Sequence, residues 1–484
     1  MIILFHPRAT RPRNRRLPLA ILHLAAVLEG REPYEIVDGN ADPDPWPTID
    51  ALAQGGQVEL LAVSVMPGPQ VRGAVAVCRA FREKYPRVPI VWGGYFPSLY
   101  TNATLNAHYV DFAVKGQGED TFLELIEALR GSRDFARIRG LAFKDQFGLH
   151  VQTAERPLRS PDEYPWLPYH RLDPAKYLAR TFLGSRTAVH QASIGCPFRC
   201  NFCGVVPVYD REKMESPART AAVLNHLQEN YGVNAVQFYD NNFFLREDHA
   251  RELADRLAPL NLHWWCEARV DIVLGYSDDT LRRLRRAGCV MIFFGVESGS
   301  DTALRNMKKQ LTSGETVALA QRIREFGIVP EYSLIFGNPE NAEQDVDENI
   351  AFARRIKQVN PDVEIVVQTY VPTPQQSGSY GDVDVDFPST PDEWITDRWY
   401  KLLIRTDPQL PWLAPEVKRR IRDFETVMNA RWPTTQDVRL TGWGRTLLKA
   451  LGSWRYALGA YRFPAELRFA QKLVRLREPR LESL

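Results

Sequence analysis

Short apolar runs alternate with amphipathic segments through about the first 130 residues. The runs predict strands at 2–5, 34–37, 60–65, 88–92 and 111–114, and helices between them at 17–28, 71–83 and 121–129. The strands after residue 30 end in glycine or turn clusters. This alternation predicts a Rossmann-like, doubly wound parallel sheet of the α/β class, in which ligands bind outside the carboxyl ends of the strands.

A second alternating region extends from residue 187 to about residue 374. Strand-like runs at 187–193, 235–239, 263–267, 291–296, 332–336 and 364–369 are separated by helical patterns such as 220–231 and 278–287. Six such units are too few for an eight-stranded barrel, so the pattern predicts a partial (β/α)6 TIM-type barrel.

The remaining segments set the domain boundaries. Residues 136–185 predict a connector, with a hairpin at 140–151 and a proline-punctuated extended stretch after it. The last hundred residues predict a mostly helical region rich in tryptophan. The expected domains are therefore 1–135, the connector 136–185, the barrel 186–385 and the helical region 386–484.

Composition narrows the class of protein. The net charge of the 484 residues is only +2, which gives no indication of a nucleic-acid partner. Six cysteines are too few for a disulfide framework and are typical of a reducing cytoplasm. At the amino end the basic residues follow the apolar ones, the reverse of a signal peptide, and no apolar run is long enough to span a bilayer. A cytoplasmic protein is expected.

Three of the cysteines lie close together in the sequence. Cys196, Cys200 and Cys203 have the spacing C-x3-C-x2-C on a short loop after a predicted strand. Thiolates are soft ligands that select iron–sulfur clusters, zinc or copper(I). A cubane cluster normally takes four cysteines, so three would leave one iron open. The alternatives are a structural zinc site, for which no second cysteine pair exists, and three unrelated buried thiols.

This loop resembles that of the radical S-adenosylmethionine (SAM) enzymes, including the aromatic residue before the last cysteine, Phe202. The resemblance implies that Cys196, Cys200 and Cys203 hold a [4Fe–4S] cluster. SAM would chelate the open iron and be cleaved to a 5′-deoxyadenosyl radical. The open partial barrel is also the one that these enzymes share.

Later loops carry further residues that resemble the family's SAM-binding segments. These loops follow the second, third and fourth predicted strands of the barrel. The loop after the fourth strand is similar to the family's G-x-E-S-G-S segment. The resemblance implies SAM contacts from Phe202, Asp240, Asn241, Glu267, Arg269, Glu297 and Ser298. Singly, such residues also serve as helix caps or surface ion pairs. The loop after the fifth strand departs from the family's G-x-P-G-E at Asn341, which weakens any role for Glu340.

The loops of the first domain resemble those of the cobalamin-binding domain found upstream of many radical SAM domains. The similar segments are 64–68, 91–97 and 114–119. They imply a cobalamin site formed by Ser64, Met66, Gly68, Gly93, Gly94, Tyr95, Gly116, Gln117, Gly118 and Glu119. The D-x-H-x-x-G motif that supplies a histidine to cobalt elsewhere is absent. A base-off cofactor is expected, and the alternative is a Rossmann-like domain that has lost its ligand.

Together the two domains resemble the class B radical SAM methyltransferases. The resemblance implies methylation of an unactivated carbon of a small molecule or lipid, through methylcobalamin and the adenosyl radical, with substrate held between the domains. A flavodoxin- or ferredoxin-like reductant is expected as the electron donor. Ring closure, ring contraction or oxidation without methyl transfer stays open, as does a cluster-bearing binding module without turnover. No catalytic side chain, and no histidine ligand, is assigned.

The carboxyl-terminal stretch is basic and amphipathic. Residues 439–480 contain ten Lys or Arg and two Glu, interleaved with residues such as Trp443, Trp454 and Phe469. The pattern favours helices packed on the barrel with a solvated basic face. The alternative is peripheral contact with a membrane.

Overall fold

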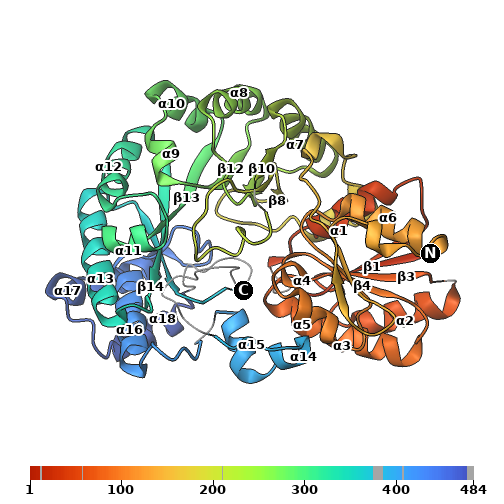
Figure 1. Ribbon diagram of the computed structural model, residues 1–484. Helices are drawn as coiled ribbons and strands as arrows, with labels where there is room; N and C mark the ends of the chain where they lie inside the picture. Colours follow the sequence, from red (N-terminus) through yellow and green to blue (C-terminus); the bar gives the residue numbers. More distant parts are fainter. Residues whose placement is uncertain (11–13, 57, 210, 374–384, 406–407, 477–484) are drawn as a thin grey trace.

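The computed structural model describes residues 1–10, 14–56, 58–209, 211–373, 385–405 and 408–476. Residues 374–384 of the predicted barrel domain and 477–484 of the predicted helical region lie outside the described residues. Two sheets lie side by side (Figure 1). The carboxyl-terminal helices of residues 415–473 lie beyond the second sheet, whereas those of residues 391–403 lie against the amino-terminal domain.

The amino-terminal sheet has seven strands in the order β2-β1-β3-β4-β5-β6-β7. The first five are parallel: β1 Ile2–His6, β2 Tyr34–Asp38, β3 Leu60–Ser64, β4 Ile90–Gly93 and β5 Phe112–Val114. Its helices are α1 Leu19–Leu28, α2 Pro45–Gly55, α3 Pro69–Lys84, α4 Tyr95–Leu99, α5 Thr101–Asn106 and α6 Glu119–Arg130. Every residue of β1 is buried because helices cover both faces of the sheet.

The two faces of this sheet have separate hydrophobic cores. Ile2 and Leu4 point toward α1 and α6, whereas Ile3 and Phe5 point toward α2 and α3. The predicted doubly wound sheet is confirmed. Helix α2 was not predicted, because only Ile49 of its eleven residues is buried and its apolar period is weak.

The hairpin expected in the connector belongs to the amino-terminal sheet. Its strands, β6 Leu141–Lys144 and β7 His150–Gln152, are antiparallel, and β6 pairs with β5. The rings of Phe112, Phe135 and Phe143 pack together across this junction. The sheet therefore extends beyond residue 135, because these aromatic side chains bury each other only when the hairpin is paired.

The second sheet has six parallel strands in the order β15-β14-β13-β12-β11-β8, so the partial (β/α)6 barrel is confirmed. The strands are β8 Thr187–His190, β11 Ala235–Phe238, β12 His263–Ala268, β13 Cys289–Glu297, β14 Val329–Phe336 and β15 Glu364–Thr369. The helices are α7 Pro217–Tyr231, α8 Glu247–Leu257, α9 Val270–Leu274, α10 Asp278–Arg286, α11 Asp301–Asn306, α12 Ser313–Ile323 and α13 Ala342–Val359. The single strand expected at 187–193 ends at His190, and β9 Ser193–Gly195 pairs instead with β10 Glu212–Met214.

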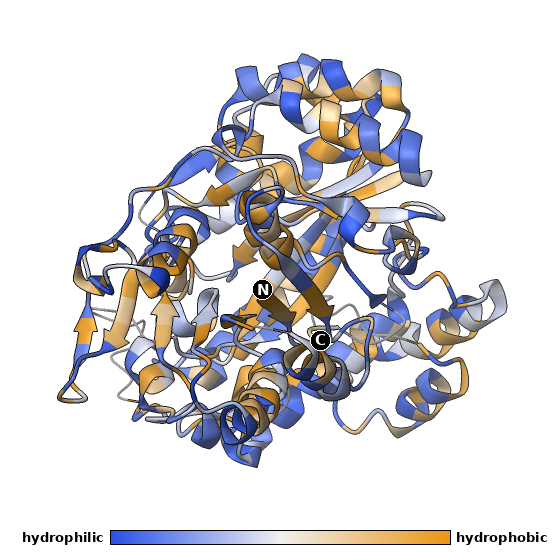
Figure 2. Ribbon diagram, turned by 90° about the vertical axis from the view of Figure 1, so that its right-hand side faces the viewer, coloured by the Kyte–Doolittle hydropathy of each residue, from blue (hydrophilic) through white to orange (hydrophobic). Residues whose placement is uncertain are grey.

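The carboxyl-terminal region is helical, as expected. It contains α14 Pro391–Trp394, α15 Asp397–Leu403, α16 Pro415–Arg431, α17 Gly442–Leu458 and α18 Ala465–Leu473. The outer helices of the molecule carry both hydrophilic and hydrophobic residues, as expected for helices with one buried and one exposed face (Figure 2). Among the residues that are described, no helix combines the length and the hydropathy needed to cross a membrane.

Candidate active site between the two sheets

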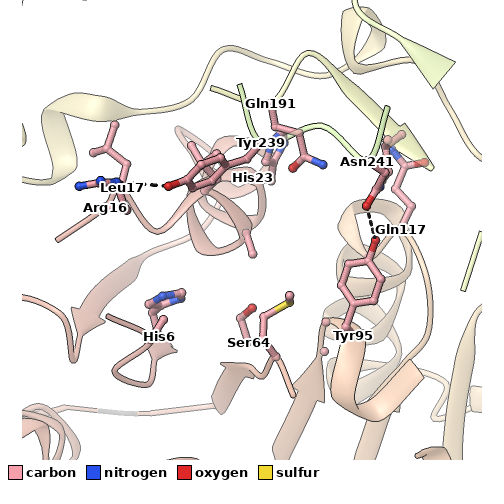
Figure 3. Close-up of a pocket in the computed structure, with 18 of the residues that line it drawn as sticks. His6, Arg16, Leu17, His23, Ser64, Tyr95, Gln117, Gln191, Tyr239 and Asn241 are labelled. Carbon is pink, nitrogen blue, oxygen red and sulfur yellow. Dashed lines mark hydrogen bonds between the residues drawn. The ribbon is translucent and has the colours of Figure 1, made fainter. Parts of the chain in front are cut away.

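One cavity of about 500 Å³ lies where the carboxyl ends of the two sheets meet. Figure 3 shows His6 and Ser64 on one side of it and Gln191, Tyr239 and Asn241 on the other. His6 and Ser64 end β1 and β3, the neighbouring strands from which the chain leaves in opposite directions. Such a switch point is where doubly wound sheets bind their ligands.

The amino-terminal wall of the cavity is formed largely by the loops predicted to bind cobalamin. Nine of the ten predicted residues line it: Ser64, Met66, Gly93, Gly94, Tyr95, Gly116, Gln117, Gly118 and Glu119. Gly68 is not among its lining residues. Cobalamin binding by these residues stays a prediction, although they converge on one surface.

Backbone, more than side chains, shapes this wall. Gly94 has φ +97°, and a Cβ atom there would lie 2.9 Å from the carbonyl oxygen of Val65. Only glycine adopts this conformation readily, so β4 ends in a bare loop that a ligand can approach closely. Met66 is 46% exposed beside this loop, an apolar side chain that a large ring could cover. A flat cofactor with an apolar face, such as a corrin, fits this surface.

Titratable groups on the same wall are mostly uncharged. Burial lowers the pKa of His6, and burial also lowers the pKa of His23 to about 4. Burial raises the pKa of Glu119 to about 7. Sequence reasoning assigned no histidine, yet His6 and His23 both line the cavity. The only signal was the place of His6 at the carboxyl end of a predicted strand.

The three predicted cluster ligands lie on the loop that follows β9. Cys200 is buried and the other two are partly buried. Burial, together with smaller contributions from the neighbouring Cys200 and Cys196, raises the pKa of Cys203 to about 11. Across the described ranges, no three His, Cys, Asp or Glu side chains converge on a single ion. Three soft thiols on one loop, close enough to affect each other's pKa, suit a multi-iron cluster.

Two buried cations brace the cysteine loop. The Arg269 guanidinium lies 3.7 Å from the centre of the Phe198 ring, and its Nη1 is 3.8 Å from Cys200 Sγ. Arg269 also donates to Asp271 and to the carbonyl oxygen of Lys309. These contacts place positive charge beside ligands that must bind as thiolates.

The second cation is Lys309, which sequence reasoning missed. Its Nζ forms a 2.7 Å ion pair with Glu297, and both side chains are less than a tenth exposed. The adjacent Lys308 is exposed, and the sequence alone does not distinguish the two lysines. The predicted SAM residues Arg269 and Glu297 thus contact or flank the cysteine loop and do not line the cavity.

The other predicted SAM residues divide between the cavity and its surroundings. Asn241 and Glu267 line the cavity, and burial raises the pKa of Glu267 to about 8. Asp240 is buried behind it, where Oδ1 accepts a 2.6 Å hydrogen bond from Ser193 while Oδ2 has no protein partner. Phe202 packs against Met307, Ile335 and Tyr370, and Ser298 contacts Asn349. SAM binding by these residues stays a prediction, and the Oδ2 atom of Asp240 is an acceptor that a ligand amine could satisfy.

Contacts across the cavity join the two walls. The Tyr95 hydroxyl donates to Asn241 Oδ1 at 3.4 Å, and Arg16 Nε donates to the Tyr239 hydroxyl at 3.3 Å (Figure 3). Burial raises the pKa of Tyr95, and the nearby Cys203 and Cys196 add to this shift. Tyr95 therefore belongs to the glycine-rich wall but reaches the neighbourhood of the cysteine loop.

The cavity continues into the interior of the barrel. Trp265, Phe293 and Val366 line this end together with Glu331 and Gln436. Trp265 Nε1 donates to Glu331 at 3.0 Å, and Gln436 Nε2 donates to the other oxygen of the same carboxylate at 2.6 Å. Gln436 comes from the segment before α17, so the carboxyl-terminal region closes the inner end of the chamber.

Family models match both halves of this site. The radical SAM superfamily model matches residues 191–353, and the B12 binding domain model matches residues 10–126. The chain therefore has a radical SAM domain preceded by a B12 binding domain. It is a cobalamin-dependent radical SAM enzyme, and its cofactors are a [4Fe–4S] cluster, SAM and cobalamin.

Several known proteins are similar to this chain. An uncharacterized methyltransferase of Pyrococcus horikoshii is 25% identical over 343 residues, covering 70% of this chain and 73% of the relative. An anaerobic magnesium-protoporphyrin IX monomethyl ester cyclase of Synechocystis is 25% identical over 312 residues, covering 63% and 60%. The methyltransferase TsrM of Kitasatospora setae has a similar fold, with a TM-score of 0.64 and 18% identity over 98% of this chain and 99% of TsrM.

Proposed function

We propose that this enzyme transfers a methyl group to a carbon atom of a small molecule bound between the two sheets. The observation that carries the proposal is the cavity between the two sheets. It is bordered by the predicted cobalamin loops on one wall and extends into the barrel, and two of its lining residues, Ser193 and Ile194, belong to β9, which leads into the cysteine loop. A substrate there would lie between both cofactors, as a reaction that uses both requires.

When bound, the cofactors would supply hydrogen abstraction and the methyl group. The chain's own residues do the rest. Arg269 contacts the cysteine loop at Cys200, and Lys309 flanks that loop in a buried ion pair with Glu297. Gly94, at the cavity wall, lets the loop after β4 pack against the Val65 backbone, where a side chain would not fit. Asn241 and Glu267 offer acceptors at the cavity wall, where the amino group of SAM would need them.

The inner end of the chamber favours a particular class of substrate. Trp265 and Phe293 give aromatic walls, while Glu331 offers carboxylate oxygens in the same space. An aromatic or otherwise apolar molecule that carries an N–H or O–H donor would match both features. An external flavodoxin- or ferredoxin-like protein would supply the electron.

The test separates methyl transfer from other radical outcomes without a known substrate. Anaerobically reconstituted enzyme, with hydroxocobalamin and a chemical reductant, is incubated with SAM, and two products are quantified. We expect both 5′-deoxyadenosine and S-adenosylhomocysteine, because methyl transfer consumes SAM in a second way.

5′-Deoxyadenosine without S-adenosylhomocysteine would overturn the proposal in favour of oxidation or of cyclisation, the activity named for the Synechocystis relative. Neither product would favour a cluster-bearing binding module.

A further inference from the structure

Exposed apolar side chains gather on the carboxyl-terminal helices. In the part of the chain that the structure describes, eleven large apolar side chains are exposed. Seven of these belong to a single stretch: Val438, Trp443, Trp454, Leu458, Phe463, Phe469 and Leu473. Such side chains are scattered singly on an ordinary surface, so this concentration marks a patch.

Helix α17 has two apolar faces. Leu448 and Gly452 lie on the inner face, where a Cβ on Gly452 would lie 2.8 Å from the backbone nitrogen of Arg431 in α16. Trp443, Trp454 and Leu458 follow the helical period along the other face. The inner face of α17 therefore packs on α16, which in turn contacts α13 of the barrel through Arg420 and Asp347, and the tryptophan face stays uncovered.

The neighbouring α18 and its turn extend the patch. Phe469 and Leu473 are one turn apart on α18 and are 71% and 61% exposed. Arg455 of α17 forms an ion pair with Glu466 of α18, which holds the two helices together. In Figure 1, α17 lies at the outer edge of the molecule, on the side away from the amino-terminal sheet.

Charge identifies what this patch would meet. Residues 439–476 contain eight Lys or Arg and one acidic residue, Glu466. Glu466 is paired with Arg455, whereas Lys449, Arg462 and Lys472 are exposed beside the aromatic side chains. Tryptophan and phenylalanine with basic residues on a helix surface are typical of the interface of an anionic bilayer.

We propose that α17, residues 459–464 and α18, together the basic aromatic face, bind the surface of an anionic lipid membrane. The aromatic rings would enter the headgroup region and the basic side chains would contact lipid phosphates. Because α17 is at the outer edge of the molecule, away from the amino-terminal sheet (Figure 1), attachment through it would leave the cavity between the sheets open.

The test is vesicle co-sedimentation of the full-length protein. Vesicles of phosphatidylcholine alone and of phosphatidylcholine with phosphatidylglycerol are compared, at low and high salt. We expect binding that requires phosphatidylglycerol, is weakened by salt, and falls more than about tenfold in Trp443→Ser/Trp454→Ser/Phe469→Ser. Each of Lys449→Gln, Arg462→Gln and Lys472→Gln is expected to weaken it by up to about fivefold.

Phe147→Ser/Leu149→Ser is the matched control. These two apolar residues are 78% and 65% exposed on the turn between β6 and β7, far from α17 in the chain, and their replacement is expected to leave binding unchanged. No vesicle binding by the parent protein would overturn the proposal. Equal binding by the aromatic variant, or self-association that this variant abolishes, would overturn it in favour of nonspecific charge attraction or of a second copy.

Discussion

The two sides of the cavity are both built on sheets of parallel strands, but they differ in the residues that they offer to a ligand. Both present the carboxyl ends of parallel strands, yet the amino-terminal wall is formed largely by glycine loops, with Arg16 and Glu119 among the few charged or titratable side chains that line it. The barrel side surrounds the cysteine loop with buried charges, among them Arg269 and the pair of Glu297 and Lys309. A bare backbone suits a wide, weakly charged ring, whereas fixed charges suit a small charged ligand and anionic thiolates.

Removing a cysteine of the loop should abolish iron binding and have the largest effect. Cys203→Ala leaves two thiolates, and we expect iron content to fall from about four per chain to near zero, with no SAM cleavage. Cys289→Ala is the control, since Cys289 is buried in β13 away from the loop. Equal loss of iron in both variants would contradict a specific role of the cysteine loop in iron binding.

Breaking the buried ion pair between Lys309 and Glu297 should have the next largest effect, on the stability of the protein. Lys309→Met leaves Glu297 buried without its partner, and we expect unfolding free energy to fall by about 3–5 kcal/mol in denaturant titrations. Lys308→Met removes an adjacent, exposed lysine and should change it by less than about 0.5 kcal/mol. Similar losses in the two variants would contradict the buried role of Lys309.

The glycine wall can be tested without touching the charged one. Gly94→Ala places a Cβ against the Val65 carbonyl, and we expect corrinoid retention after desalting to fall at least about tenfold while iron content is kept. Gly148→Ala has a comparable φ of +80° but nothing within 4 Å, so it controls for backbone strain. Unchanged corrinoid in Gly94→Ala would separate this loop from cobalamin.

The smallest effect concerns the buried carboxyl of Glu119. Its pKa is raised to about 7 in the folded protein, so the folded state holds a proton that the unfolded state releases above about pH 4.5. Stability from this group therefore declines as pH rises from about 4.5 to 7. Glu119→Gln should raise the unfolding free energy of the cofactor-free protein by about 1–3 kcal/mol at pH 8 and by little at pH 4.5. An equal gain at both pH values would contradict the shifted pKa.

Local pattern predicted most of the fold but only part of the site. Strands such as β1 and β3 were recognisable because they are short, fully buried apolar runs, and the cysteine loop because its spacing is specific. Glu331 and Gln436 are 105 residues apart and meet only through the tertiary fold, so no motif could have joined them. Lys308 and Lys309 are equivalent in sequence. A left-handed backbone at Lys308, with φ of 52°, precedes the lysine that is buried.

The contact between Gln436 and Glu331 has a consequence for how such enzymes diversify. The residue that closes the chamber belongs to the carboxyl-terminal region, outside the strands that carry the cofactor loops. Exchanging residues 434–436 would change the depth and polarity of the chamber while leaving both cofactor walls intact. The segment that closes the inner end of the cavity can therefore vary independently of the cofactor-binding loops, so that the same radical chemistry could act on new substrates.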